Sequence, residues 1–119
     1  MGEVIELKRD KPFTLKETQT LLPIVRRITD ESVALVEKLK KRVEEVDPPP
    51  DHRPAYEREL NHIVDRWSDK ILKLGAEPKG LWLVDFDNGA GYYCWRYPEE
   101  EVCFYHTYET GFSGRTPIL

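Results

Sequence analysis

The 119-residue sequence has only two cysteines, and it opens with no apolar stretch of the kind that a secretory signal contains. Its apolar runs are all much shorter than the roughly 20 residues that a membrane-spanning helix needs. We therefore expect a cytoplasmic protein with reduced thiols and no membrane partner.

Positive charge is also scarce, since 18 Lys and Arg stand against 22 Asp and Glu and give a net charge of -4. A nucleic-acid backbone is bound by a basic face, so this balance argues against a nucleic-acid partner. The sequence also lacks a phosphate-binding loop, a dinucleotide fingerprint and a Ser-His-Asp spacing. No enzyme class is indicated, and whether the protein is an enzyme stays open.

The sequence does contain a clear signal for the start of a helix. Thr14, with Glu17 three residues later, forms a capping box, in which each side chain accepts a hydrogen bond from the other residue's backbone amide. Phe13 precedes the cap and can act as a hydrophobic staple. These residues predict a helix that begins near Leu15.

Proline and glycine divide the helical region. Pro23 predicts a break or kink, so we expect a short N-terminal helix to about Leu22 and then a long helix to about Val46. A second long helix follows the Pro-rich segment 47–50 and stops at Gly75. Each long helix has one apolar stripe, so the two should form an antiparallel hairpin that needs a covering layer.

The covering layer is expected from residues 81–119, which hold most of the aromatic residues and both cysteines. Alternating side chains and turn residues predict strands at 81–86, 91–97 and 102–108. The predicted fold class is therefore α+β, a long antiparallel helical hairpin (with a short N-terminal helix) packed with a three-stranded antiparallel β-meander. A chain of this length should form a single domain. Its parts would be an N-terminal arm at 1–12, the helical hairpin at 13–75, and the β-meander with the C-terminal tail at 81–119.

Strand parity gathers three polar side chains on one face of the meander. With Phe86 opposite Tyr92 at the first turn, Asp85, Tyr93 and His106 form one row across the three strands. A carboxylate that fixes the tautomer of a histidine is a common device at acid–base and metal sites. The alternative is a polar cluster that satisfies itself at the edge of a small core.

Three further side chains near the end of the chain have two interpretations each. Arg115, between glycines and the C-terminus, can bind a carboxylate or phosphate, or it can pair with Asp85 or Glu99 and hold the tail in place. Cys94 and Cys103 should be buried free thiols, too far apart for an unstrained disulfide. Two thiolates are also too few for a zinc site unless His or another subunit adds ligands.

Several motifs in the sequence resemble a bacterial family known as domain of unknown function 2203. The resemblance spans residues 13–117 and implies a fold and a cytoplasmic location, but no activity. The family pattern has an acidic residue just after the histidine, where this chain has Thr107, and Glu109 can stand in for it. The motifs are Phe13-Thr14-Leu15-x-Glu17 with Leu21-Leu22-Pro23, then Leu83-Val84-Asp85-Phe86, Cys94-Trp95-Arg96 with Glu99, Tyr105-His106, and Gly111-Phe112-Ser113-Gly114-Arg115-Thr116-Pro117.

Two functions follow from these observations. The first is a binding or adaptor module, either a homo-oligomer or bound to a protein partner, with the exposed aromatics and the acidic helical hairpin as contact surface. The alternative is a small-molecule or metal-binding protein, which includes the case of an enzyme, with its site around Asp85, His106 and Arg115. A divalent metal ion is the one cofactor indicated, with His106 and Asp85 as its candidate ligands. The candidate ligand-binding residues are Asp85, Tyr93, Trp95, Glu99, His106 and Arg115.

Overall fold

The computed structural model describes residues 11–45 and 53–118, so the predicted N-terminal arm lies outside the described residues except for 11 and 12. The α+β class is confirmed, but the sheet has five strands rather than the predicted three. No helix in the described part of the chain is long and apolar enough to pass through a lipid bilayer. The elements are α1 (Leu15–Glu45), α2 (Arg53–Lys73), β1 (Glu77–Pro78), β2 (Leu83–Asp87), β3 (Gly91–Arg96), β4 (Phe104–Thr107), η2 (Phe112–Gly114) and β5 (Thr116–Pro117).

The start of α1 has the predicted capping box. The backbone amide of Glu17 donates to Thr14 Oγ1 at 3.1 Å, and the amide of Thr14 donates to Glu17 Oε1 at 3.0 Å. Phe13 is buried and packs edge-on against Phe86 of β2, with ring centroids 5.4 Å apart. The residue before the cap therefore fixes the helix to the sheet.

The predicted break at Pro23 is wrong, because α1 runs through this residue without interruption. Proline in a helix removes one backbone hydrogen bond and crowds the preceding turn. Pro23 itself is exposed, whereas Leu22 and Val25 beside it are buried in the core. Burial of the neighbouring side chains keeps the helix continuous, so no separate N-terminal helix forms.

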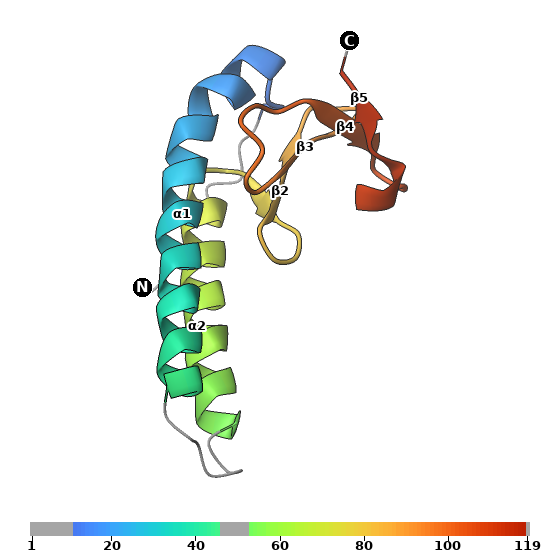
Figure 1. Ribbon diagram of the computed structural model, residues 1–119. Coiled ribbons are helices and arrows are strands. Elements are labelled where there is room, and N and C mark those ends of the chain that lie inside the picture. Colours follow the sequence, from blue (N-terminus) through green and yellow to red (C-terminus); the bar gives the residue numbers. More distant parts are fainter. Residues whose placement is uncertain (1–10, 46–52, 119) are drawn as a thin grey trace, which may run out of the picture.

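The two helices lie side by side as an antiparallel pair (Figure 1). Gly75 ends α2 as predicted, with φ of 87° and its amide donating to Leu72 O at 2.9 Å. Trp67 of α2 is almost fully buried, and its indole N–H donates to Thr29 Oγ1 of α1 at 2.9 Å. This hydrogen bond satisfies the polar atom of a large core side chain and ties the helices together.

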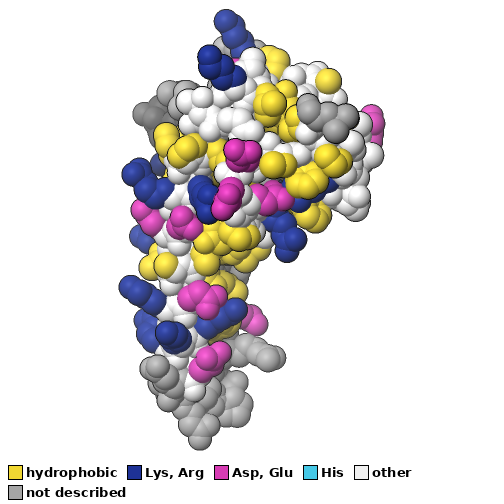
Figure 2. All heavy atoms as spheres, turned by 45° about the horizontal axis from the view of Figure 1, so that its top comes forward, with side chains coloured by type: hydrophobic (Ala, Val, Ile, Leu, Met, Phe, Trp, Pro, Cys, Tyr) yellow, Lys and Arg dark blue, Asp and Glu magenta, His cyan; other side chains and the backbone are white. Residues whose placement is uncertain are grey.

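The strands form an antiparallel meander in the order β1-β2-β3-β4-β5. Val84, Phe86 and Trp95 point from one sheet face into a core shared with Val25 and Trp67 of the helices. The sheet lies at the end of the hairpin where α1 begins and α2 ends, and the other end of the hairpin projects away from it (Figures 1 and 2). Residues that alternate with this core set therefore lie on the outer face of the sheet.

The predicted register is wrong by one residue between β2 and β3, where Phe86 pairs with Tyr93 instead of Tyr92. The turn explains the shift. Asp87 Oδ1 accepts a hydrogen bond from the amide of Gly89, and the amide of Asn88 donates to Gly91 O, both at 2.9 Å. These bonds close a tighter loop than the five-residue turn assumed from sequence.

The register between β3 and β4 is also shifted by one residue, with Tyr93 opposite Tyr105. A tight second turn would place Val102 opposite Tyr97. Instead the amide of Val102 donates to Gln19 Oε1 at 3.1 Å, and Gln19 Nε2 donates to Val102 O at 2.9 Å. The Gln19 side chain thus bonds to both the backbone amide and the carbonyl of Val102, so Val102 does not pair with Tyr97. The pairing of β3 with β4 begins instead with Cys94 opposite Phe104.

Candidate metal centre

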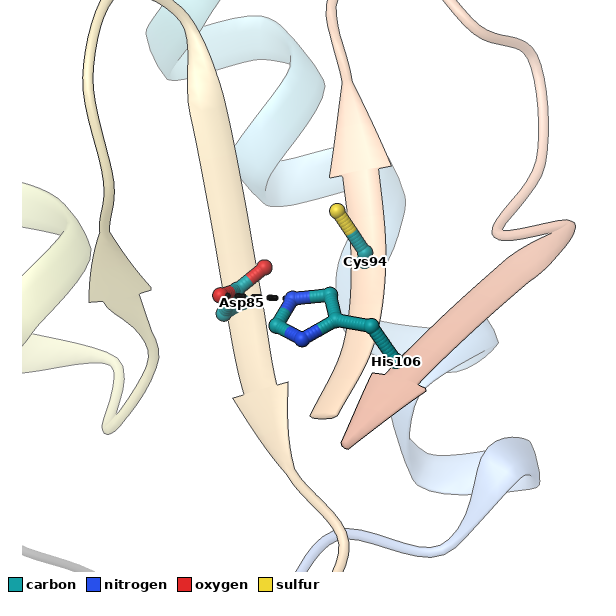
Figure 3. A group of neighbouring side chains, drawn as sticks. All are labelled: Asp85, Cys94 and His106. Atoms are coloured by element: carbon teal, nitrogen blue, oxygen red, sulfur yellow. Dashed lines mark hydrogen bonds and ion pairs between the residues drawn. The ribbon is translucent and has the colours of Figure 1, made fainter. Parts of the chain in front are cut away.

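Asp85 of β2, Cys94 of β3 and His106 of β4 lie together on the outer face of the sheet (Figure 3). The corrected register brings them together, since Asp85 pairs directly with Cys94, and His106 is on the same face as Phe104, the partner of Cys94. One ligand atom from each residue lies within 4.8 Å of the others. The three residues are 3%, 0% and 3% exposed, respectively. Ionisable groups buried this deeply are normally paired or bound to a metal.

Both ring nitrogens of His106 face hydrogen-bond acceptors. Nδ1 lies 2.8 Å from the carbonyl oxygen of Thr107, and Nε2 lies 3.0 Å from Asp85 Oδ2. A carbonyl only accepts, so Nδ1 carries a proton and donates it. Nε2 can then carry a second proton and pair with the carboxylate, or it can direct its lone pair at a cation that both residues bind.

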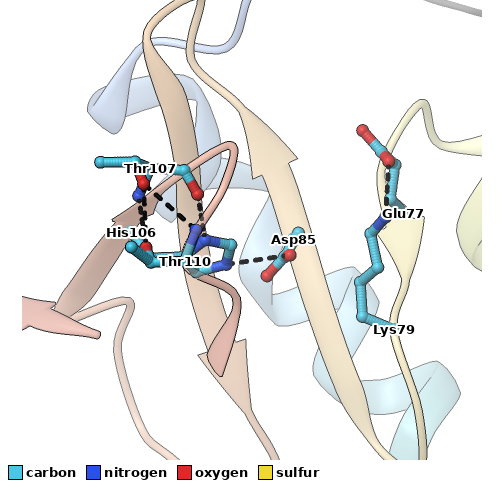
Figure 4. A network of polar contacts seen from close by, with 6 residues as sticks. All are labelled: Glu77, Lys79, Asp85, His106, Thr107 and Thr110. Atoms are coloured by element: carbon cyan, nitrogen blue, oxygen red, sulfur yellow. Dashed lines mark hydrogen bonds and ion pairs between the residues drawn. The ribbon is translucent and has the colours of Figure 1, made fainter. Parts of the chain in front are cut away.

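One carboxylate oxygen of Asp85 accepts no hydrogen bond from a described residue. Oδ2 faces His106, whereas Oδ1 is buried and has no hydrogen-bond partner among the described residues. Lys79, which directly follows β1, is paired with Glu77 at 3.2 Å (Figure 4). A buried carboxylate oxygen without a donor is unfavourable, and a bound cation would satisfy it.

The Cys94 side chain is a thiol at neutral pH. Burial, together with the negative charge of Asp85, raises its pKa to about 12. A divalent cation beside the sulfur would reverse this effect, because metal coordination deprotonates a thiol. Cys94 therefore has the position and burial of a ligand, although its proton must leave when a metal binds.

A turn after β4 holds His106 in place. The amide of Thr107 donates to Thr110 Oγ1 at 3.1 Å, and the amide of Thr110 donates to Thr107 Oγ1 at 3.2 Å (Figure 4). The same Thr107 supplies the carbonyl that accepts from Nδ1 of His106. Metal-binding histidines are commonly oriented in this way, by a hydrogen bond from the nitrogen that does not face the metal.

Two of the predicted site residues, Arg115 and Glu99, meet each other rather than Asp85. Arg115 Nη2 donates to both carboxylate oxygens of Glu99, at 2.8 and 2.7 Å. The guanidinium carbon also lies 3.9 Å from the ring centroid of Phe104 and 4.7 Å from that of Phe112. This arrangement is the tail-holding alternative expected from the sequence, with Glu99 as the partner.

Tyr93 and Trp95 lie on the opposite face of the sheet from Asp85, so the predicted row of Asp85, Tyr93 and His106 is wrong. The one-residue shift between β2 and β3 puts Cys94 where Tyr93 was expected. Trp95 is fully buried, and its indole N–H donates to Glu99 O at 2.8 Å. Both aromatics belong to the packing between sheet and helices.

Sequence reasoning missed Cys94 as a member of the site, although it noted that histidine could add to the cysteines as ligands. Alternation alone placed Cys94 away from Asp85, because it depended on the wrong register. The expectation of two buried thiols is wrong for Cys103, which is exposed. Glu109 is also exposed, and Asp85 provides the carboxylate that faces His106.

The two thiols should react very differently with a thiol reagent such as Ellman's reagent. We expect Cys103 to react quickly in the native protein and Cys94 to react only after unfolding, since Cys94 is fully buried and its pKa is raised to about 12. Mass spectrometry of the labelled peptides would assign the sites. Equal labelling of both cysteines in the native protein would contradict the described burial.

The ligand set of nitrogen, sulfur and carboxylate oxygen indicates which ions the site can take. Zn²⁺ binds all three donor types, whereas Ca²⁺ and Mg²⁺ prefer oxygen ligands. Zinc sites are usually tetrahedral with bonds of about 2.0–2.3 Å. Three protein ligands would leave one position for a water molecule or a small ligand. The three donor atoms lie within 4.8 Å of one another.

Comparison with known proteins gives one match. A family model described as an uncharacterized conserved protein (DUF2203) matches residues 11–118, nearly the whole chain. Neither the curated proteins nor the solved structures give a match.

Proposed function

Because the chain belongs to the DUF2203 family, whose description names no activity, we propose a function from its own side chains. The protein binds a divalent transition metal, with Zn²⁺ preferred, through Asp85, Cys94 and His106. One observation carries the proposal: Nε2 of His106 is directed at a carboxylate while Nδ1 is already committed to a carbonyl. A metal ion bound by both side chains would accept the Nε2 lone pair and neutralise the carboxylate.

A simple ion pair is the main alternative to a metal. A doubly protonated His106 would donate to Asp85 Oδ2 and to the Thr107 carbonyl. It would leave Asp85 Oδ1 without a strong hydrogen-bond donor, since the buried Cys94 thiol offers the carboxylate only a weak S–H. A bound metal ion would give each of the three buried side chains, Asp85, Cys94 and His106, a partner.

The metal-binding function is favoured over a binding or adaptor role by this site. The triad is enclosed, so it offers no exposed surface to a protein partner. A cytoplasmic location would keep the Cys94 thiol reduced and able to bind the ion. Catalysis would need a substrate to reach the fourth coordination position.

Titration with Co²⁺ tests the proposal, since cobalt replaces zinc and its thiolate complexes absorb in the near ultraviolet. We expect a thiolate-to-cobalt absorption band that saturates at one ion per chain. Cys94→Ser should remove the band, whereas Cys103→Ser, which changes an exposed cysteine, should keep it. The proposal fails if no band appears, or if the band depends on Cys103.

The same titration should depend on pH. Metal binding releases the Cys94 proton, whose pKa is raised to about 12 by burial and by Asp85, so affinity should rise with pH. One released proton gives about a tenfold gain in affinity per pH unit below that pKa. Buffers of pH 6 to 8 would show the slope, and an affinity that does not change with pH would exclude a thiolate ligand.

A further inference from the structure

The free end of the helical hairpin has an open groove that the metal site does not involve. Nine side chains line it, four from within residues 35–42 of α1 and five from within residues 58–66 of α2, and its volume is about 840 Å³. We call it the basic groove. It lies where the hairpin projects beyond the sheet (Figures 1 and 2), so within the described residues only the two helices form its walls.

The basic groove concentrates positive charge in an acidic protein. Five Lys and Arg line it against a single Glu, an excess of four positive charges, although the whole chain has a net charge of -4. Arg42 pairs with that glutamate, Glu59, at 3.2 Å. Lys38, Arg58 and Arg66 make no ion pair with any described residue, and neither does Lys41, so four cations remain available to a partner.

The same groove has apolar side chains between its cations. Leu35 is 46% exposed on α1, and Ile63 is only partly buried on α2. Leu35, Lys38 and Arg42 follow one another at helical spacing, as do Ile63 and Arg66 on the facing helix. The groove therefore places one apolar side chain from each helix among five cations.

We infer that the basic groove binds an amphipathic helix of a partner protein whose apolar stripe is flanked by Asp and Glu. Such a helix would bury Leu35 and Ile63, pair its carboxylates with the unpaired cations, and complete a three-helix bundle. A helical hairpin has only one neighbour for each helix, so a third helix is a natural addition.

Charge argues against two other occupants. A second copy of the chain that docked groove to groove would bring two excesses of four positive charges together. A nucleic acid would meet apolar side chains and no Phe, Tyr or Trp for stacking, on a protein whose net charge is -4. An acidic helix matches both the apolar and the cationic parts of the groove.

The test uses the full chain and a fluorescently labelled synthetic helix of about 20 residues, long enough to span about 30 Å. The peptide has Leu at positions i, i+3, i+4 and i+7 and Glu on either side. We expect saturable binding by fluorescence anisotropy that weakens as salt is added. A peptide with Lys in place of every Glu should bind at least about tenfold more weakly.

Matched charge reversals locate the binding. The double variant Lys38→Glu with Arg66→Glu should weaken binding by about tenfold or more, since it reverses one cation on each wall. The control, Lys16→Glu with Arg27→Glu, makes the same charge change at exposed positions of α1 outside the groove, and should change affinity by less than about threefold. Circular dichroism checks that all variants fold.

Several results would overturn the inference. They are no binding of the acidic peptide at low salt, equal binding of the Lys peptide, or equal weakening by the groove and control variants. Tighter binding of a DNA duplex than of the peptide would assign the groove to nucleic acid instead. Self-association in sedimentation experiments that the groove variant abolishes would assign it to a second copy of the chain.

Discussion

Replacing Trp67 with alanine is expected to lower the free energy of unfolding by about 3–5 kcal/mol. The side chain is 1% exposed, and it lies where α1, α2 and the sheet meet. Its ring packs edge-on against Trp82 at 5.1 Å, and its N–H bonds to Thr29. A domain of this kind is stable by only about 5–15 kcal/mol, so the variant should be close to unfolding.

Urea denaturation followed by circular dichroism would measure this loss. Leu81→Ala is a suitable control, because Leu81 is 56% exposed and its truncation should change stability by no more than about 0.5 kcal/mol. Trp67→Phe keeps the ring but removes the hydrogen bond to Thr29, so an intermediate loss is expected. A Trp67→Ala protein as stable as the Leu81→Ala protein would mean that Trp67 is not in the core.

Replacing Asp85 with alanine should have the second large effect, and that effect should depend on metal. Loss of the carboxylate leaves His106 buried without its partner, and breaking a buried pair costs about 3–5 kcal/mol. Zinc should stabilise the unmodified protein by about 2.7 kcal/mol at a concentration one hundred times its Kd. Asp85→Ala should lose this gain, because the ion loses a ligand.

Thermal unfolding with and without zinc, and with a chelator, would measure both parts of the effect. Asp69→Ala is the matched control, since Asp69 is exposed on α2 and makes no described contact. It should leave both the stability and the response to zinc unchanged. A normal zinc response in Asp85→Ala would exclude Asp85 as a ligand.

Local chemistry predicted the ends of the helices correctly. The Thr14–Glu17 capping box and the stop at Gly75 depend on residues within one turn of each other, so the sequence contains the whole interaction. The break at Pro23 was wrongly predicted because the buried residues that keep α1 continuous, Leu22 and Val25, belong to the core shared with the distant sheet and α2. That tertiary contact overrides a local preference.

The two missing strands and the register have the same kind of explanation. β1 (Glu77–Pro78) and β5 (Thr116–Pro117) are two residues long and each contains proline, which lowers strand propensity and suits an edge. The position of β4 depends on Gln19, which lies 83 residues before Val102 in the sequence. No local pattern contains that contact.

The prediction of the candidate site from sequence depends on the register of the strands. Asp85 and His106 were found from the sequence because the two shifts of one residue add up to two residues, which leaves both side chains on the same face. Cys94 was missed because only one of those shifts affects its strand relative to Asp85. The basic groove was missed because its cations alternate with acids along each helix and meet only when the helices pair.

The central claim is that Asp85, Cys94 and His106 bind one metal ion. Crystals grown with zinc, measured on both sides of the zinc absorption edge, test it most directly. We predict a single strong anomalous peak within about 2.0–2.3 Å of an oxygen of Asp85, Cys94 Sγ and His106 Nε2. A structure with zinc present but no peak at the triad, and with His106 paired to Asp85 alone, would contradict the claim.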